Sequence, residues 1–297
     1  MIIDGKAVAA RVLDRISKQV TMLVAKNGPI LGVPGLAVIQ VGNRSDSSKY
    51  VEMKHLAAKK VGIASLNFAF EKDCKTEDII GTIDKLNQRQ DIDGILVQLP
   101  LPRDQKRILN TIDPEKDVDG FHPYNIGLLT RMGEELRQEN KLFDPTQCRN
   151  VACTAMGVMM LLEGTDIAGK SAVILGRSNI VGLPLALMLL HRDATVTFCH
   201  SHTVDIKERC LQADILVAAM GQAEMVKGDW IKPGAVVIDV GINVQNEILV
   251  GDVDFKQAVK RAARITPVPG GVGPMTVAML MLNTLNNRIH RLAHLKI

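Results

Sequence analysis

Apolar residues in the first half of the chain follow two alternating spacings. Segments with apolar positions three or four residues apart, as on one face of a helix, are followed by short runs of Val, Ile and Leu, as in a buried strand. The pattern predicts helices at residues 5–26, 47–61 and 76–88, and strands at residues 36–41, 64–70 and 94–97. Such alternation indicates βαβ units and a mainly parallel sheet.

The alternation resumes in the second half, after a polar segment at residues 131–150 in which we place a linker. The pattern predicts helices at residues 154–163 and 180–191, and strands at residues 171–175, 195–199, 215–219 and 236–240, with a short last strand entering Thr266. A final helix at residues 276–292 is expected to pack back on the first part. The predicted fold is therefore α/β with two domains, residues 1–147 plus 276–297 and residues 148–275, and a cleft between them.

A segment dense in Pro and Gly, from Pro267 to Thr276, precedes that final helix. Proline lacks the backbone N–H and fixes φ, whereas glycine is favoured where φ is positive or where a backbone approaches closely. We expect a shaped turn outside any helix or central strand. It is either a rigid wall against a flat ligand or a hinge between the domains.

Composition places the chain among ordinary globular proteins, because 46% of its 297 residues are hydrophobic and 23% are charged. The formal net charge is +4, but Lys and Arg are scattered and aromatic residues make up only 3%. Few stacking platforms argue against nucleic-acid binding, whereas a mildly basic balance suits small anionic ligands.

Cysteine usage and the N-terminus predict a cytoplasmic protein. The 5 cysteines form no Cys-x-x-Cys motif, so reduced thiols are expected rather than disulfides or a zinc ribbon. The N-terminus lacks a basic stretch followed by an apolar one, and no apolar run approaches the roughly 18 residues of a membrane span. We therefore expect no membrane association.

A glycine turn between a predicted strand and a predicted helix is the candidate nucleotide site. Gly176, Arg177 and Ser178 follow the strand at residues 171–175, and the helix start behind them offers partial positive charge to a pyrophosphate. The usual G-x-G-x-x-G motif is incomplete, since Ser178 and Val181 stand where its later glycines would be. An ordinary structural turn is the alternative.

The end of the next predicted strand indicates which nucleotide binds. Sites for NAD usually place a carboxylate there on the ribose 2′-OH, but this strand ends at Cys199 and is followed by His, Ser, His and Thr. Ser201 and Arg177 can instead bind a 2′-phosphate. The arrangement favours NADP, although Asp205 lies a little further on and weakens the inference.

Tyr50 and Lys54 stand four residues apart on the predicted helix at residues 47–61, so both project from one face. The same spacing occurs in short-chain dehydrogenases. In that family the glycine turn precedes the pair, whereas here it follows, so the family fits poorly. Lys54 is either a catalytic amine or a solvated helix lysine.

Two further segments carry candidate site residues. Gln98 directly follows the strand at residues 94–97, at the sheet edge where ligands gather in α/β proteins, although a plain strand end is the alternative. Asp117 and Asp119 lie in the turn Lys116-Asp-Val-Asp-Gly120. No further acidic residue or Asn follows at EF-hand spacing, so we predict no metal site there.

These motifs together resemble those of the bifunctional methylenetetrahydrofolate dehydrogenase/methenyltetrahydrofolate cyclohydrolases over essentially the whole chain. The matching pieces, in order, are Val41-Gly42 with Ser48, Tyr50 and Lys54; Gln98-Leu-Pro-Leu-Pro102; Lys116-Asp-Val-Asp-Gly120; Gly176-Arg-Ser-Asn-Ile-Val-Gly182; Thr195-Val with Cys199-His-Ser201; Asp239-Val-Gly-Ile-Asn243; and Pro267 to Thr276. The chain departs from the family in having Ala152-Cys-Thr-Ala155 where Pro-Cys-Thr-Pro is usual, and a longer segment at residues 131–150.

The resemblance implies a substrate and catalytic domain and a Rossmann-like NADP domain. It implies that Lys54 is the principal catalytic residue, that Gln98 orients it, that Tyr50 stacks on the aminobenzoate ring of folate and that Asp119 grips the pterin. The residues implied to line the folate cleft are Val97, Gln98, Leu99, Pro269, Gly270, Gly271, Val272 and Gly273. Those implied to hold NADP are Thr154, Gly176, Arg177, Ser178, Ser201, Ile242 and Thr284.

The activity implied is oxidation of 5,10-methylenetetrahydrofolate with NADP, followed by hydrolysis of the methenyl product to 10-formyltetrahydrofolate. The resemblance also implies a homodimer. A shikimate-dehydrogenase-like oxidoreductase and a non-catalytic nucleotide-sensing module are the alternatives. In a sensing module Tyr50, Lys54, Gln98 and Asp119 would serve no common purpose.

Overall fold

The computed structural model describes residues 1–138 and 149–294. The chain divides into two compact units. Unit 1 comprises Met1–Ala9, Leu129–Pro145 and Thr154–Thr276, and unit 2 comprises Ala10–Leu128, Thr146–Cys153 and Val277–Ile297. Boundaries between the units fall within the helices α1 (Gly5–Gly32), α5 (Pro123–Gln138) and α10 (Val272–His294).

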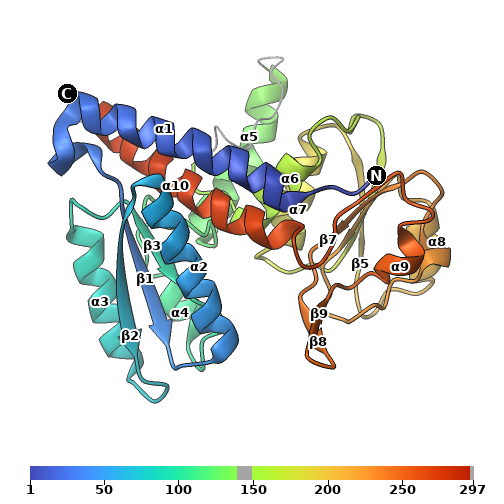
Figure 1. Ribbon diagram of the computed structural model, residues 1–297, viewed down its shortest axis with the longest axis horizontal. Coiled ribbons are helices and arrows are strands. Elements are labelled where there is room, and N and C mark those ends of the chain that lie inside the picture. The colour runs from blue at the N-terminus through green and yellow to red at the C-terminus, as the bar shows by residue number, and fades with distance from the viewer. Residues whose placement is uncertain (139–148, 295–297) are drawn as a thin grey trace. The chain divides into compact units, whose positions relative to one another are not determined.

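The sheet of unit 2 is parallel and has the strand order β2-β1-β3 (Figure 1). Its strands are β1 (Gly35–Val41), β2 (Ala64–Phe70) and β3 (Gly94–Val97), and its shorter helices are α2 (Ser45–Val61), α3 (Thr76–Gln88) and α4 (Gln105–Leu109). The central strand β1 starts as a continuous apolar run without solvent exposure, as expected of a strand covered on both faces. Helix α3 places Ile79, Ile83 and Leu86 on one stripe against this sheet.

The sheet of unit 1 is also parallel, with the order β10-β7-β6-β4-β5. Its strands are β4 (Ser171–Leu175), β5 (Thr195–Cys199), β6 (Ile215–Ala218), β7 (Val236–Asp239) and β10 (Arg264–Ile265). The helical segments are α6 (Cys153–Leu161), α7 (Gly182–Leu190), α8 (Ile206–Leu211), η2 (Gly228–Trp230) and α9 (Phe255–Ala258), and a hairpin joins β8 (Asn243–Gln245) to β9 (Ile248–Val250). The chain leaves β4 towards β5 and later returns on the other side of β4 to form β6. The carboxyl ends of β4 and β6 therefore flank a switch point, where open α/β sheets bind ligands.

Two expectations about the connections are wrong. Residues 131–138 are not linker but the end of α5, because Pro123 fits the first helical position and the polar residues that follow include good helix formers. Residues 139–148 of the expected linker lie outside the described residues. The final helix begins at Val272 rather than at 276, since Pro274 falls in the first turn, where no backbone N–H is needed.

The cysteines that the structure describes, Cys74, Cys153, Cys199 and Cys210, carry free thiols, and Cys148 lies outside the described residues. Within residues 1–138 and 149–294, no helix has the length and apolar character needed to cross a membrane.

Candidate active site

Lys54 and Gln98 meet at the carboxyl edge of the sheet in unit 2. Lys54 lies on α2 and is only 9% exposed, and its Nζ donates a hydrogen bond of 2.8 Å to Oε1 of Gln98. Gln98 extends the ladder of β3 by one residue, because its backbone N–H donates to Ile39 on β1. Its Nε2 donates to the carbonyl of Leu99 at 2.8 Å, which turns the amide oxygen towards the amine. The predicted pair is therefore a fixed hydrogen-bonded unit.

The charges around Lys54 oppose the effect of its burial. Burial lowers the pKa of the Lys54 amine, while the Asp119 carboxylate and the Cys153 thiol act in the opposite direction. Burial raises the pKa of Asp119 to about 7; the Lys54 charge counteracts this rise and Asp117 adds to it. The amine and the carboxylate are thus electrostatically coupled, and burial lowers the pKa of the amine and raises that of the carboxyl group.

Asp119 is presented by a turn that is bound to the edge of β3. Asp117, in the same turn, forms a parallel bridge with Ile95, and its buried Oδ2 accepts from the backbone N–H of His122 at 2.8 Å and from Nδ2 of Asn125 at 2.9 Å. Asp117 is therefore a structural acceptor. Over the part of the chain that the structure describes, no group of three or more His, Cys, Asp or Glu side chains has the arrangement of a metal site.

The remaining residues of unit 2 that we predict to contact folate differ in their burial. Tyr50 lies half-buried on α2, one turn before Lys54. The side chain of Val97 is buried in the core, so this residue has only its backbone to offer a ligand, whereas Leu99 is half-buried. Ser48, also on α2, accepts a hydrogen bond of 2.9 Å from Nε2 of Gln40.

The glycine turn of unit 1 lies at the carboxyl end of β4, beside the switch point. Gly176 has a φ of +117°, and a Cβ there would clash with the carbonyl of Ala219 after β6. A Cβ on Gly182, the first residue of α7, would clash with the carbonyl of Gly176. The turn is thus packed so closely that both positions need glycine. Arg177 and Ser178 are exposed at its tip.

These residues fit NADP. Exposed donors at the tip of β4 precede the start of a 9-residue helix, as a pyrophosphate site requires. Ser201 is exposed in the turn after β5, and Ile242 is 47% exposed after β7. Thr154 is half-buried, and its Oγ1 lies 3.2 Å from Oγ1 of Thr276.

Among the predicted site residues, Thr284 departs from expectation, and the Pro/Gly segment is only partly described by the fold. Thr284 is fully buried in unit 2, where its hydroxyl donates to the carbonyl of Leu280 at 2.8 Å, so it packs in the core and we drop it from the cofactor set. The Pro/Gly segment starts in unit 1 as a turn with Gly270 at a φ of +108°. Val272 and Gly273 already belong to α10. That residues 269–273 line the folate site stays a prediction.

Two buried carboxylates of unit 1 were not among the predicted site residues. Asp252 accepts from the successive backbone N–H groups of Met220, Gly221 and Gln222, at 2.6, 2.9 and 2.8 Å, and so shapes the turn after β6. Asp239 accepts a hydrogen bond of 2.9 Å from the backbone N–H of Asp252. Burial raises the pKa of Asp239 to about 7. The resemblance pointed to Asp239 by motif only. Asp252 had no signal in the sequence, because its partners lie 30 to 32 residues away.

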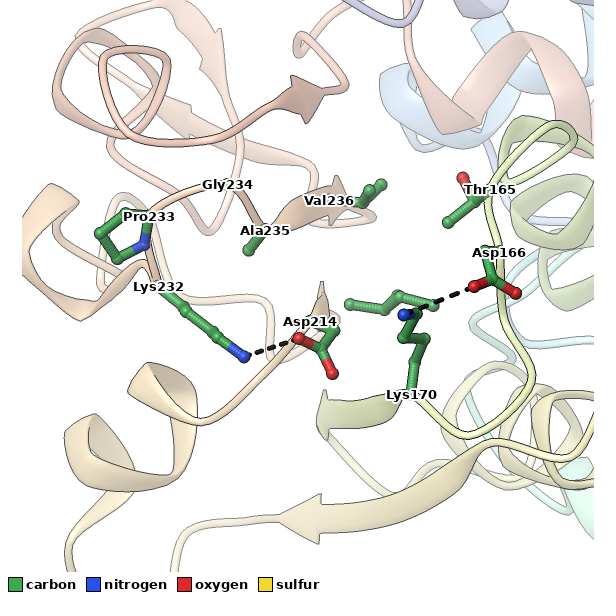
Figure 2. A pocket seen from close by; sticks show the side chains of 10 residues that line it. Thr165, Asp166, Lys170, Asp214, Lys232, Pro233, Gly234, Ala235 and Val236 are labelled. Atoms are coloured by element: carbon green, nitrogen blue, oxygen red, sulfur yellow. Dashed lines mark hydrogen bonds and ion pairs between the residues drawn. The ribbon is translucent and has the colours of Figure 1, made fainter.

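A cavity of about 230 Å³ lies at the opposite, amino end of the same sheet (Figure 2). Its charged side chains neutralise one another: Lys232 pairs with Asp214 at 2.6 Å, and Lys170 with Asp166 at 3.4 Å. This cavity contains none of the predicted site residues.

Comparison with known proteins covers both parts of the chain. Residues 3–119 match the family model described as the tetrahydrofolate dehydrogenase/cyclohydrolase catalytic domain, and residues 152–291 match the NAD(P)-binding domain of the same family. The bifunctional protein FolD of Geotalea daltonii is 50% identical over 296 residues, which cover 98% of this chain and 99% of that protein. Bifunctional protein FolD 2 of Arabidopsis thaliana is 50% identical, over 96% of this chain and 94% of that protein.

Solved structures of the same family are also similar to this chain. The Trypanosoma brucei methylenetetrahydrofolate dehydrogenase-cyclohydrolase (FolD), complexed with NADP and an inhibitor, superposes with a TM-score of 0.90 at 41% identity, covering 98% of each chain. The FolD enzyme from Campylobacter jejuni gives a TM-score of 0.89 at 40% identity, covering 98% of this chain and 99% of that one. The chain therefore belongs to the tetrahydrofolate dehydrogenase/cyclohydrolase family.

Proposed function

We propose that Lys54 performs the proton chemistry of a bifunctional one-carbon enzyme, and that Gln98 and Asp119 position the amine and the substrate. The chain is an NADP-dependent methylenetetrahydrofolate dehydrogenase and methenyltetrahydrofolate cyclohydrolase. It oxidises 5,10-methylenetetrahydrofolate to the 5,10-methenyl cation and hydrolyses that cation to 10-formyltetrahydrofolate. The observation that carries the residue assignment is the buried Lys54 amine, bound to the Gln98 amide and coupled to Asp119.

NADP, when bound, supplies the acceptor for the hydride that leaves the one-carbon bridge. Gly176, Arg177 and Ser178 bind its pyrophosphate at the end of β4. Ser201 and Arg177 bind the 2′-phosphate, because no carboxylate stands at the end of β5. Thr154 and Ile242 add contacts.

Lys54 serves the hydrolysis as a proton carrier. A neutral amine accepts a proton from the water that attacks the bridge carbon, and returns it to the folate nitrogen released when the ring opens. The second proton of the water leaves to solvent, which balances the loss of the positive charge on the substrate. Burial and the cationic substrate both favour the neutral amine, so the form that accepts a proton is available at lower pH than for an ordinary lysine.

The neighbours of Lys54 position the amine and the substrate. Gln98 holds Nζ through its amide oxygen and keeps the amine aimed. Asp119 accepts hydrogen bonds from the pterin, and Tyr50 stacks on the aminobenzoate ring. Val97 and Leu99 line the folate site, the former through its backbone.

The decisive variant is Lys54→Met, which keeps the aliphatic stem and removes the amine. Loss of a general acid–base group costs about 10²- to 10⁴-fold in rate, so cyclohydrolase activity should disappear into the uncatalysed reaction. Methenyltetrahydrofolate absorbance reports the activity, thermal melting reports folding and a titration reports NADP binding, and the last two should stay as in the wild type. Lys49→Met, at an exposed position of the same helix, is the control. Cyclohydrolase activity within a few-fold of wild type in Lys54→Met would refute the assignment.

We propose in addition that the enzyme works as a homodimer in the cytoplasm, without nucleic-acid or membrane partners. Support comes from the family resemblance, the scattered charge and the low aromatic content. Analytical ultracentrifugation tests the dimer, which should sediment with twice the chain mass of 32.4 kDa. The full-length family match leaves no place for the shikimate-dehydrogenase-like or the non-catalytic alternative.

A further inference from the structure

The peptide that leads into Asp119 is held by two buried donors. Nδ2 of Asn283 donates to the carbonyl of Val118 at 2.8 Å, and Sγ of Cys153 donates to the same oxygen at 3.2 Å. That carbonyl belongs to the rigid, planar peptide unit whose other end is the nitrogen of Asp119. Hydrogen bonds that hold the Val118 carbonyl oxygen therefore also orient the backbone of Asp119.

Asn283 also binds a second segment against the same turn. Its Nδ2 donates to the carbonyl of Val151 at 3.0 Å, across 132 positions of the sequence. Gly120, which follows Asp119, has a φ of +71° and lies so close to Val151 that a Cβ there would clash with its backbone. One amide on α10 thus joins the turn that carries Asp119 to the segment that contains Val151.

The chemistry of Asn283 is hard to explain by packing alone. The side chain is 0% exposed, and its Oδ1 finds no hydrogen-bond partner within residues 1–138 and 149–294. A buried acceptor without a partner is destabilising, and an apolar side chain of the same shape would avoid that cost. Only the two donors of the amide distinguish asparagine from leucine at this position.

We propose that Asn283 and Cys153 are positioning residues for the cyclohydrolase step, which hold the Val118–Asp119 peptide so that the Asp119 carboxylate faces Lys54. The inference rests on the proposed function of Lys54. Asn283 acts through the carboxylate, and Cys153 does so in addition to its electrostatic interaction with Lys54.

Lys54 and Asp119 interact with each other and with two further titratable groups, Cys153 and Asp117. Lys54 interacts with the charge of Asp119 and with the Cys153 thiol, and Asp119 interacts with Lys54 and with Asp117. If Asp119 turns away, Lys54 loses an opposite charge, and its pKa falls further below the usual value. The pH profile of hydrolysis is therefore a readout that a purely structural defect would not move.

The test compares Asn283→Ala with Asn287→Ala. Asn287 lies one turn later on α10, is also buried, and donates from Nδ2 to Asp93 and Asn150, neither of which belongs to the catalytic turn. Both variants should melt at lower temperature. Asn283→Ala alone should lower cyclohydrolase kcat/KM about 10-fold or more and move its pH limb to lower pH, with KM for NADP within about two-fold of wild type.

Two milder variants, at Cys153, test the inference if Asn283→Ala does not fold. Cys153→Ala removes the second donor, whereas Cys153→Ser retains a donor to Val118. The alanine variant should show the shifted pH limb and the serine variant should stay nearer to wild type. An unchanged pH limb in folded Asn283→Ala, or in Cys153→Ala, with kcat/KM matching Asn287→Ala, would overturn the inference. If Lys54→Met is inactive, such a result would overturn only the positioning role and leave the proposed function intact. If Lys54→Met is active, both the proposed function and the positioning role lose their basis.

Discussion

At position 54 the chain places an amine where water hardly reaches, and the surrounding residues determine what that amine does. Lysine on a helix is ordinarily solvated, with its stem along the surface and its charge in water. Here Nζ points to the Gln98 amide at the end of a neighbouring strand, and burial lowers the pKa of the amine. Burial therefore favours the neutral amine, and the Asp119 charge opposes this effect.

A pH profile should separate the two groups. Asp119 has a pKa of about 7, and its ionised form is the one that accepts from the pterin, so cyclohydrolase kcat/KM of the wild type should fall as the pH drops below about 7. Asp119→Asn should remove the contribution of Asp119 to this limb and leave that of Lys54. It should also lower the pKa of Lys54 further, because the carboxylate charge that raises it is gone, and any remaining limb should lie at lower pH. Rates are measured with the uncatalysed ring opening subtracted. A limb that stays at the same pH in Asp119→Asn would contradict the assignment.

Cofactor choice also depends on single side chains. The wild type should use NADP with a higher kcat/KM than NAD, since Arg177 and Ser201 can bind the 2′-phosphate. Arg177→Ala should lower kcat/KM for NADP by about 10-fold or more, because hydrogen bonds to charged groups contribute about 1.5–3 kcal/mol, and should change NAD use much less. Arg192→Ala, beyond the far end of α7, is the control. Equal specificity constants for the two nucleotides in the wild type would be incompatible with this role.

Sequence reasoning found the residues whose function depends on local context. Lys54 and Gln98 became candidates through a helical spacing and a strand end, the family resemblance implied their roles, and the structure joins them by a hydrogen bond. It failed for Thr284, because no pattern in an apolar helix tells which face meets the core. Asn283 and Asp252 could not be predicted, since their partners come from distant parts of the chain.

At the scale of elements, the strand–turn–helix unit from β4 to α7 depends on how closely its turn packs. Gly176 and Gly182 let the turn contact backbone from both sides. Elements with strong periodicity and clear stop signals were predicted with the bounds that the structure shows, among them β2, α3, β3, β4 and β5. The short helices α4, α8 and α9 and the β8–β9 hairpin were missed, because segments of so few residues carry too little periodicity.

Replacing glycine by alanine separates backbone strain from close packing. Gly176 and Gly164 both have positive φ, +117° and +75°, but a Cβ at Gly164 meets nothing within 4 Å. Gly164→Ala should therefore cost only the conformational strain, about 1–3 kcal/mol. Gly176→Ala should destabilise more and should raise KM for NADP, because the turn must move away from Ala219. Urea unfolding and NADP titration measure the two effects. A Gly176→Ala variant no less stable than Gly164→Ala would show that the turn yields without cost.

At the scale of the whole molecule, two parallel sheets each place candidate site residues at the carboxyl ends of their strands. The parallel sheets follow from the alternation of the sequence, whereas the candidate residues came from the motifs and the family resemblance. The assignment to a family needed the motifs, since the fold alone does not determine an activity. The buried polar contacts that complete each unit required the structure.

One such contact should dominate the stability of unit 2. Asp93, before β3, forms ion pairs with Arg288 at 2.9 Å and Arg291 at 3.0 Å on α10, and its side chain is 1% exposed. Burial raises the pKa of Asp93 in spite of both arginines, which shows how strongly the site disfavours charge. Asp93→Ala leaves a buried guanidinium uncompensated and should lower the free energy of unfolding by about 3–5 kcal/mol.

The matched control is Asp14→Ala, which breaks an ion pair of 2.7 Å between side chains that are 64% and 69% exposed, and should cost about 0–1 kcal/mol. Both variants are compared by denaturant unfolding. Equal losses would mean that burial does not determine the contribution of these ion pairs.

The distribution of unit 2 along the chain bears on how the enzyme comes into being. Its sheet is built from residues that are translated before Thr154–Thr276, but Asn283, Asn287 and Arg288 leave the ribosome only after all of that segment. Domains fold as units while synthesis proceeds from the N-terminus. The nascent chain can therefore complete the nucleotide-binding unit first, and unit 2 is completed last although its strands are made earlier.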